Sequence, residues 1–355
     1  MCARFQDEAL RDLCCEHVQA DEIWSFRYAN AENIPDEHRG EFRYRDVWTS
    51  TVRDADTKPV SGQFGSSANA PERRKHSVAG LVLSATVALA SVWASAGSQP
   101  SLIPFPDTEH GIVRSGGPIT GYPSALAAVT SVMESTMGFP PLEGALRLYP
   151  NKLSLAAGII REGYDASYAS QMAGTIRGIG TPGNILLNES ALRGLSWPAK
   201  TALLAHELTH VAEYKLADGR RSNLDQWLRE GLAEWVAWQV MDRLRLGSQA
   251  DRRQVAVANL RKARRHDQLP VFDELLAPRA WLTLPDQQLP GLMYDEAFLA
   301  ADLLIARHGL ASALEYFRLV GGSDDHLANF KQAFGENRWN FNQDFTAHLQ
   351  RLLGP

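Results

Sequence analysis

The chain has 355 residues, of which 45% are hydrophobic and 22% are charged, the profile of an ordinary soluble globular protein. Its formal net charge is -5, so electrostatics give no reason to expect nucleic acid or an anionic membrane surface as a partner of the main body. The three cysteines are Cys2, Cys14 and Cys15. The rest of the chain therefore has no disulfide framework, and any metal there must be held by histidine and carboxylate.

The first segment, residues 1–70, contains the runs VQADEIWSF (residues 18–26), DVWT (46–49) and DADTK (54–58). These runs resemble part of a DDE-type insertion-sequence transposase. The resemblance covers about residues 10–63 and implies that Asp21 is the first of three carboxylates that hold two divalent ions around a phosphodiester. The similarity stops before the second and third carboxylates. We therefore expect a poorly ordered, inactive fragment fused to an unrelated protein.

Residues 71–96 have the layout of a secretory signal peptide. A basic cluster (RRKH, 73–76) precedes an uncharged, mostly apolar run (77–93), and the small-x-small pattern ASA (94–96) follows. The alternatives are a buried core helix, or an uncleaved membrane anchor through residues 77–93 with its positive flank on the cytoplasmic side. We expect the main domain to be exported to the periplasm or the cell exterior, or to be anchored outside the cytoplasm.

Residues 97–122 are rich in glycine, proline and serine and are interpreted as a linker or an irregular lead-in. The remaining residues, 123–355, are interpreted as one domain. Its first part is predicted to contain one helix, at 124–137, and strands at 145–149, 171–176 and 184–188. Gly178, Gly180 and Gly183 are interpreted as turn positions.

The rest of the domain has helical patterns. Ser196 is a good helix cap and Pro198 suits a first turn, so a long helix is predicted from Ser196 to about Lys215. A second helix is predicted to begin at Ser222 and to continue to about Leu246. Further helices are predicted at 250–265, 293–308, 310–319, 325–334 and 341–353. A small sheet followed by a helical half is an α+β arrangement.

The run HELTH (206–210) is the strongest functional signal. His206 and His210 are four residues apart, so a helix places both imidazoles on one face, where they can share one zinc ion with Glu207 beside it as general base. Such a run occurs by chance in about one protein of this length in a hundred, and the alternative is two incidental histidines on a helix surface. The apolar flanks favour a buried helix, where unpartnered histidines would cost several kcal/mol.

The run WLREGLAEW (227–235) supplies the third predicted ligand. Glu230 follows His210 by twenty positions, which allows a helix end, a turn and a returning helix. Two histidines and Glu230 would form a ligand set with one open position for water. Glu234, one turn further on, is placed to accept the outer N–H of a ligand histidine. A solvated helix face is the alternative, which the apolar neighbours disfavour.

HELTH followed by WLREGLAEW resembles the gluzincins, and most of all the peptidase MA-like domains related to the zinc aminopeptidases. The resemblance covers about residues 140–355 and includes GLMYDEAF (291–298) and FKQAFG (330–335). It implies a zincin-like fold and zinc-dependent hydrolysis of peptide bonds. It also implies a tyrosine that stabilises the oxyanion, for which Tyr294 is the candidate. A tyrosine of the core is the alternative, and His326 is a weaker alternative donor.

The resemblance has departures. Arg229 stands where the well-studied families usually carry asparagine, and no exopeptidase signature is present, so an aminopeptidase assignment is not supported. The run from Arg252 to His266 is interpreted as a solvated helix face rather than a nucleic-acid groove.

The predicted mechanism is hydrolysis by a metal-activated water, whose proton Glu207 removes and later passes to the leaving amine. The strand at 184–188 is expected to be the sheet edge along which an extended peptide pairs. The expected partners are one Zn²⁺ ion and a peptide or protein substrate. The alternatives are a non-catalytic zincin-fold binding protein, and DNA transposition through the first segment.

Overall fold

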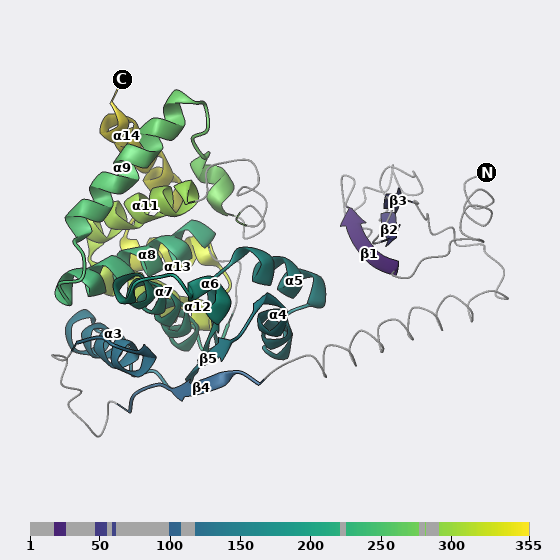
Figure 1. Cartoon of the computed structure of the whole chain (residues 1–355). Helices are drawn as coiled ribbons and strands as arrows, with labels where there is room; N and C mark the ends of the chain where they lie inside the picture. Colours follow the sequence, from purple (N-terminus) through teal and green to yellow (C-terminus); the bar gives the residue numbers. More distant parts are fainter. Residues whose placement is uncertain are drawn as a thin grey trace, which may run out of the picture. The chain divides into compact units, whose positions relative to one another are not determined.

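The structure, a computed structural model, describes residues 18–25, 47–54, 59–61, 99–107, 118–220, 225–276, 281 and 291–354. The chain divides into two units, residues 1–88 and 89–355, and each unit has its own sheet (Figure 1). The predicted signal segment, residues 71–96, lies outside the described residues, and so does most of the segment that resembles a transposase.

In the first unit, three strands form an antiparallel sheet in the order β1-β2-β3. Their bounds are Val18–Ser25 for β1, Val47–Asp54 for β2 and Pro59–Ser61 for β3. Asp21, which the transposase resemblance singles out, lies in β1 opposite Thr51 of β2. The resemblance itself stays a prediction.

The sheet of the second unit has four strands in the order β4-β5-β7-β6. Their bounds are Ser101–Pro104 for β4, Ala145–Tyr149 for β5, Asn184–Asn188 for β7 and Gly178–Thr181 for β6. The central strands β5 and β7 are parallel, and β4 and β6 each pair antiparallel with one of them. Residues 101–104 were interpreted as part of a linker, and this interpretation is wrong because they form β4. The strand was missed because four residues are too few to show the two-residue period of a strand.

The strand predicted at 184–188 is confirmed as β7, but its predicted place at the sheet edge is wrong. β7 pairs with β5 on one side and with β6 on the other. Ile185 and Leu187 pack into the main apolar core, and Leu186 packs into a smaller core on the other face. The unbroken apolar run of this strand is typical of a strand that is buried on both faces. The edge strand on this side of the sheet is β6, which pairs with β7.

β6 and β7 form a hairpin whose two-residue turn ends in Gly183, at a φ of 75° that favours glycine. Gly178 and Gly180, expected to mark turns, instead lie within β6. Helix α7 (Trp197–Leu216) passes so close that a Cβ at Gly180 would lie 2.4 Å from the backbone oxygen of Glu207. The absence of a side chain at Gly180 therefore lets β6 pack closely against this helix.

Two helices, α4 (Lys152–Arg161) and α5 (Ala166–Thr175), connect β5 to β6. The strand predicted at 171–176 is therefore wrong. The helix was missed because Asp165 was not considered as its N-cap. The side chain of Asp165 accepts a hydrogen bond from the backbone N–H of Tyr168 at 2.8 Å and caps α5. Once the cap is formed, the following residues continue as a helix.

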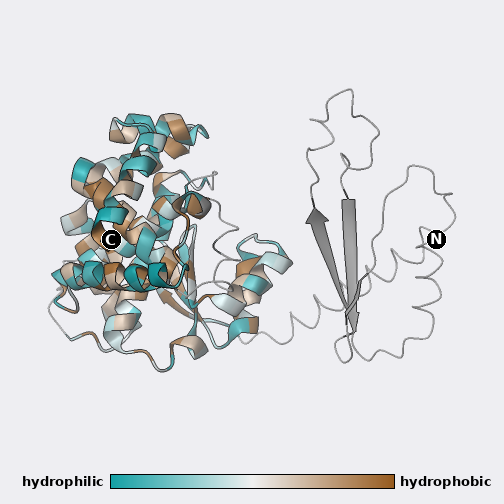
Figure 2. Cartoon of the chain, turned by 90° about the horizontal axis from the view of Figure 1, so that it is seen from above, coloured by the Kyte–Doolittle hydropathy of each residue, from teal (hydrophilic) through white to brown (hydrophobic). Residues whose placement is uncertain are grey.

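The helical half matches the predicted order of helices, so the unit is α+β (Figure 1). α3 (Tyr122–Met137) is the first described helix of the unit, α7 follows Ser196 as predicted, and α8 (Gln226–Arg243) is the second long helix. The other elements are α6 (Glu189–Leu192), α9 (Gln249–Arg265), the 3₁₀ helix Phe272–Leu276, α11 (Leu292–His308), α12 (Leu310–Gly322), α13 (His326–Phe334) and α14 (Arg338–Leu353). In Figure 2 these helices carry both hydrophilic and hydrophobic faces.

None of the described helices is by itself long and apolar enough to cross a membrane. The pair α11 and α12, bent by 104° at their junction, meets that requirement of length and composition only when the two are taken together. The proposed anchor, residues 77–93, lies outside the described residues.

The main apolar core lies among α7, α8 and α11, and two of these helices cross at very short range. At Gly231 of α8, a Cβ would lie 2.3 Å from the backbone oxygen of Ala297 in α11. Near the start of α8, Trp227 is fully buried and stacks on Phe341 of α14, with ring centroids 5.4 Å apart. The crossing fixes the distance between α8 and α11, and both helices carry predicted site residues.

We predict that Gly231→Ala lowers the free energy of unfolding by about 1–3 kcal/mol, because the added methyl group fits only if a helix moves. The matched control is Gly174→Ala in α5, where a Cβ would have nothing within 4 Å. The control is expected to be neutral, or stabilising by up to about 1 kcal/mol, since alanine is the better helix former. Urea denaturation followed by circular dichroism measures both, and equal stability of the two variants would contradict the close crossing.

Candidate metal centre

The middle of α7 carries the motif predicted from the sequence. The helix begins as predicted, with the side chain of Ser196 accepting a hydrogen bond from the backbone N–H of Ala199 at 3.4 Å. Every residue from Leu204 to Tyr214 is buried. His206 and His210 are only 8% and 6% exposed, so the alternative of two histidines on a helix surface is wrong.

Three side chains converge at this point. His206, His210 and Glu230 each offer one ligand atom, and these atoms all lie within 4.8 Å of one another. The Nε2 atoms of the histidines are 3.2 Å apart. Oε2 of Glu230 lies 3.4 Å from Nε2 of His206 and 3.5 Å from Nε2 of His210. Gln226 donates to the other oxygen of Glu230 at 2.7 Å, which leaves Oε2 for the histidine side.

The outer nitrogen of His206 contacts Glu234, the residue predicted for that role. Nδ1 of His206 is 3.2 Å from Oε1 of Glu234. Arg252 of α9 donates to the other oxygen of Glu234 at 3.1 Å and also binds Asp295 of α11. A carboxylate on the outer nitrogen fixes the ring orientation and tautomer of a ligand histidine. His206 is thus held in place by side chains from three neighbouring helices.

Arg252 corrects one interpretation made from the sequence. The basic run 252–266 was expected to be a solvated helix face, but Arg252 is buried between two carboxylates. The reason is the helical period, which turns one member of a basic run inward while the others face water. Arg261, Lys262 and Arg265 are exposed, in agreement with the interpretation.

His210 has its own carboxylate partner, Glu213, which the sequence analysis did not single out. Nδ1 of His210 is 2.9 Å from Oε2 of Glu213, and Arg229 donates to the same oxygen at 3.2 Å. Arg229 is the residue that departs from the pattern of the gluzincins. Here Arg229 contacts Glu213, which in turn contacts His210. The outer nitrogen of each histidine therefore contacts a carboxylate, and each of these carboxylates accepts a hydrogen bond from an arginine.

Burial and charge act on the histidines in opposite directions. Burial lowers the pKa of His206, but hydrogen bonds with Glu230 and Glu234 outweigh it and raise this pKa well above the usual value. Burial likewise lowers the pKa of His210, while Glu213 and Glu230 raise it to about 9. Burial raises the pKa of Glu230, yet the two histidines hold it well below its usual range. The surroundings therefore stabilise positive charge at the point where the three side chains meet.

Carboxylates outnumber arginines in this cluster. The carboxylates belong to Glu207, Glu213, Glu230, Glu234 and Asp295, and the arginines are Arg229 and Arg252. With neutral imidazoles the cluster has an excess of negative charge in a buried place, where uncompensated charge costs several kcal/mol. A divalent cation offsets that excess. The donor set and its charge therefore fit a metal ion.

Glu207 lies beside the ligands, against β6. It is buried, a Cβ at Gly178 would lie 3.3 Å from its Oε1, and the backbone N–H of Gly180 donates a hydrogen bond to its carboxylate. Burial raises the pKa of Glu207 above the usual value, against the opposing effect of the two histidines. Its carboxylate therefore takes up a proton more readily than an exposed glutamate does.

Tyr294 of α11 lies at the same site, with its ring centroid 6.1 Å from that of His206. Burial and the nearby glutamates raise the pKa of its phenol well above the usual value, so the hydroxyl stays protonated. Trp281 packs edge-on against the Tyr294 ring at 5.0 Å and donates to the backbone oxygen of Leu275 at 3.0 Å. Trp281, which the sequence analysis did not name, thereby limits the movement of Tyr294.

The alternative donor, His326, is not brought to this site. It is the first residue of α13, and its charge acts on Asp225, at the N-terminus of α8. It makes no hydrogen bond or ion pair with the three candidate ligands among the described residues. A cavity of about 470 Å³ is lined by Tyr294, Glu234, Lys262 and neighbouring residues.

Comparison of the chain with protein-family models, with curated proteins and with solved structures finds no match. The resemblances to gluzincins and to a transposase therefore stay predictions. What the buried centre does is inferred from its ligand atoms, its charges and the side chains that hold them.

With Zn²⁺ as the probe metal, we predict that Arg252→Met weakens metal binding to the full chain by about 10- to 100-fold, because Glu234 then no longer holds the ring of His206 in one orientation. Arg253→Met is the matched control, since Arg253 is the next residue and pairs with Asp302 instead. Competition with a chromophoric chelator measures both affinities. Equal affinity of the two variants would show that Arg252 does not support the centre.

Proposed function

We propose that the chain is a zinc metallopeptidase with a zincin-like fold, in which His206, His210 and Glu230 hold one Zn²⁺ ion. The observation that carries this is the spacing of the three ligand atoms, at 3.2, 3.4 and 3.5 Å. Tetrahedral ligands at about 2.0–2.1 Å from zinc lie about 3.3–3.4 Å apart, whereas neighbouring octahedral ligands at that radius lie about 2.9 Å apart. The spacing favours the tetrahedron.

The donor types support the same metal. Two imidazole nitrogens and one carboxylate oxygen are the ligand set of catalytic zinc sites that keep a fourth position for water or substrate. Zinc bound there lowers the pKa of its water and polarises a substrate carbonyl. The second unit has no cysteine, so no thiolate in it competes with these ligands.

The side chains around the ligands then have distinct roles in peptide hydrolysis. Glu207 takes the proton of the attacking water and passes it to the leaving amine, and its raised pKa suits both steps. Tyr294 donates a hydrogen bond to the developing oxyanion, for which its phenol must stay protonated. Glu234 and Glu213 hold the ligand histidines in the required orientation.

The substrate in this proposal is an extended peptide that pairs with the β6 edge, and not with β7 as first expected. β6 is an outer strand of its sheet and runs directly along α7 at Gly180. A peptide added at such an edge gains main-chain hydrogen bonds and is aligned with the general base. The 470 Å³ cavity beside Tyr294 is the place for one substrate side chain.

The proposal also includes export. Its support is the basic, apolar and small-x-small order of residues 71–96, which the described residues do not include. The first segment, residues 1–70, has no role in the proposed reaction.

The test is the Glu207→Gln variant of the full chain. We expect it to retain bound zinc and to hydrolyse a fluorogenic peptide library at least about a hundred-fold more slowly than the wild type, because the base is lost while the ligands remain. Glu315→Gln, an exposed glutamate on α12, is the matched control and should keep the wild-type rate. Zinc content is measured on all three proteins, and a chelator should abolish the wild-type activity.

Two outcomes would contradict the proposal. A zinc-loaded Glu207→Gln protein that cleaves at the wild-type rate would exclude Glu207 as the base. A zinc-loaded wild type that binds peptides and cleaves none of them would favour the non-catalytic binding protein instead.

A further inference from the structure

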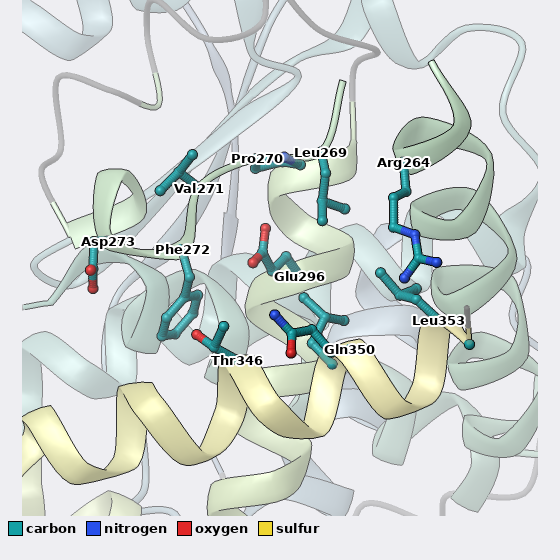
Figure 3. Close-up of a pocket in the computed structure, with 12 residues that line it drawn as sticks. Arg264, Leu269, Pro270, Val271, Phe272, Asp273, Glu296, Thr346, Gln350 and Leu353 are labelled. Carbon is teal, nitrogen blue, oxygen red and sulfur yellow. The ribbon is translucent and has the colours of Figure 1, made fainter. Parts of the chain in front are cut away.

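A second cavity, of about 620 Å³, is lined by residues that play no part in the metal centre (Figure 3). It lies between the segment 269–273, α11 and α14. Its wall is largely apolar, with Leu269, Phe272, Leu349 and Leu353 among the lining residues. A cavity of a few hundred Å³ with an apolar wall and few polar groups is typical of a site for a small molecule.

Glu296 of α11 is the exceptional residue of this cavity. Its side chain is 1% exposed, and its Oε2 has no hydrogen-bond partner. Among the described residues it makes no ion pair either, and Figure 3 shows its carboxyl group in the midst of the lining side chains. Burial raises the pKa of Glu296 well above the usual value, and no cation of the described residues opposes this effect. A buried polar group without a partner requires an explanation.

Other buried carboxylates of this unit are paired within the fold. Asp295, the preceding residue, binds Arg252 and Asn259. Asp225 binds Arg338. These acids are thus supplied with cations or donors, whereas no residue that the structure describes supplies one to Glu296. Since an unpaired buried carboxyl costs stability, a partner for Glu296 is expected from beyond the described residues.

The remaining polar groups of the cavity define what that partner is. Oδ1 of Asp273 already accepts from Asn342 at 3.1 Å. Arg264 lies beside Leu353 in Figure 3 and makes no ion pair with Glu296. A ligand for this cavity therefore needs one cationic donor for Glu296 and an apolar body for the rest of the wall.

We propose that the cavity binds a small organic cation, a protonated amine on an apolar chain or ring. The ammonium group lies on the carboxylate of Glu296, and the apolar body packs against Phe272 and Leu349. This site is separate from the proposed peptidase reaction and does not depend on it.

The test is isothermal titration of the zinc-loaded full chain with 2-phenylethylamine and with its uncharged counterpart 2-phenylethanol. We expect the wild type to bind the amine at least about ten-fold more tightly than the alcohol, because only the ammonium group forms an ion pair with the carboxylate of Glu296 in addition to a hydrogen bond. In Glu296→Gln, which keeps the shape and loses the charge, the two probes should bind equally. Equal binding of both probes to the wild type, or an unchanged preference in Glu296→Gln, overturns the proposal.

A second variant keeps the test decisive if Glu296→Gln does not fold. Leu349→Trp fills the cavity and leaves Glu296 in place, so it should bind neither probe. Thermal melting shows whether each variant is folded. Binding of the amine to folded Leu349→Trp with wild-type affinity would place the ligand elsewhere and overturn the proposal, as would the absence of any binding to the wild type.

Discussion

Burial of the two histidines of α7 is the constraint on which the rest of the second unit depends. Imidazoles and carboxylates inside a protein are tolerated only where neighbouring groups compensate their charge and their hydrogen bonds. Three other helices supply these groups: α8 brings Glu230 and Glu234, α9 brings Arg252 and α11 brings Asp295. The helical half is therefore arranged around a charged cluster as well as an apolar core, and removal of one member leaves another buried without its partner.

Two glycines let the backbone approach this cluster closely. Gly180 brings β6 against α7, and Gly231 brings α11 against α8. As a consequence, the backbone of β6 packs against α7 at Glu207, and the backbone of α11 packs against α8 next to Glu230. Rigid elements rather than flexible side chains therefore position both residues. Sites built on rigid elements hold their reacting groups within narrow limits, as the proposed hydrolysis by a positioned water requires.

Local patterns in the sequence predicted the candidate ligands and most helices, because capping, helical periodicity and the HELTH spacing each act within a few residues. The contact of Glu213 with His210 could have been predicted, since the two residues are three positions apart on the same helix. The ion pair of Arg252 and Asp295 could not be predicted, because the two residues are far apart in sequence and meet only through tertiary packing. The inner place of β7 was missed for a related reason. Its partner β6 has the sequence GIGT, in which two glycines weaken the strand propensity of Ile179 and Thr181, and its pairing with β7 is a tertiary contact.

The central claim is that one zinc ion is held by two histidines and a glutamate of the second unit. X-ray absorption at the zinc edge, on the full chain loaded with one equivalent of zinc, tests it most directly. The predicted result is a four-coordinate shell of nitrogen and oxygen at about 2.0–2.1 Å, with the outer scattering of imidazole rings. A shell that contains sulfur at about 2.3 Å would contradict the claim, since it would place the metal on Cys2, Cys14 or Cys15 of the first segment.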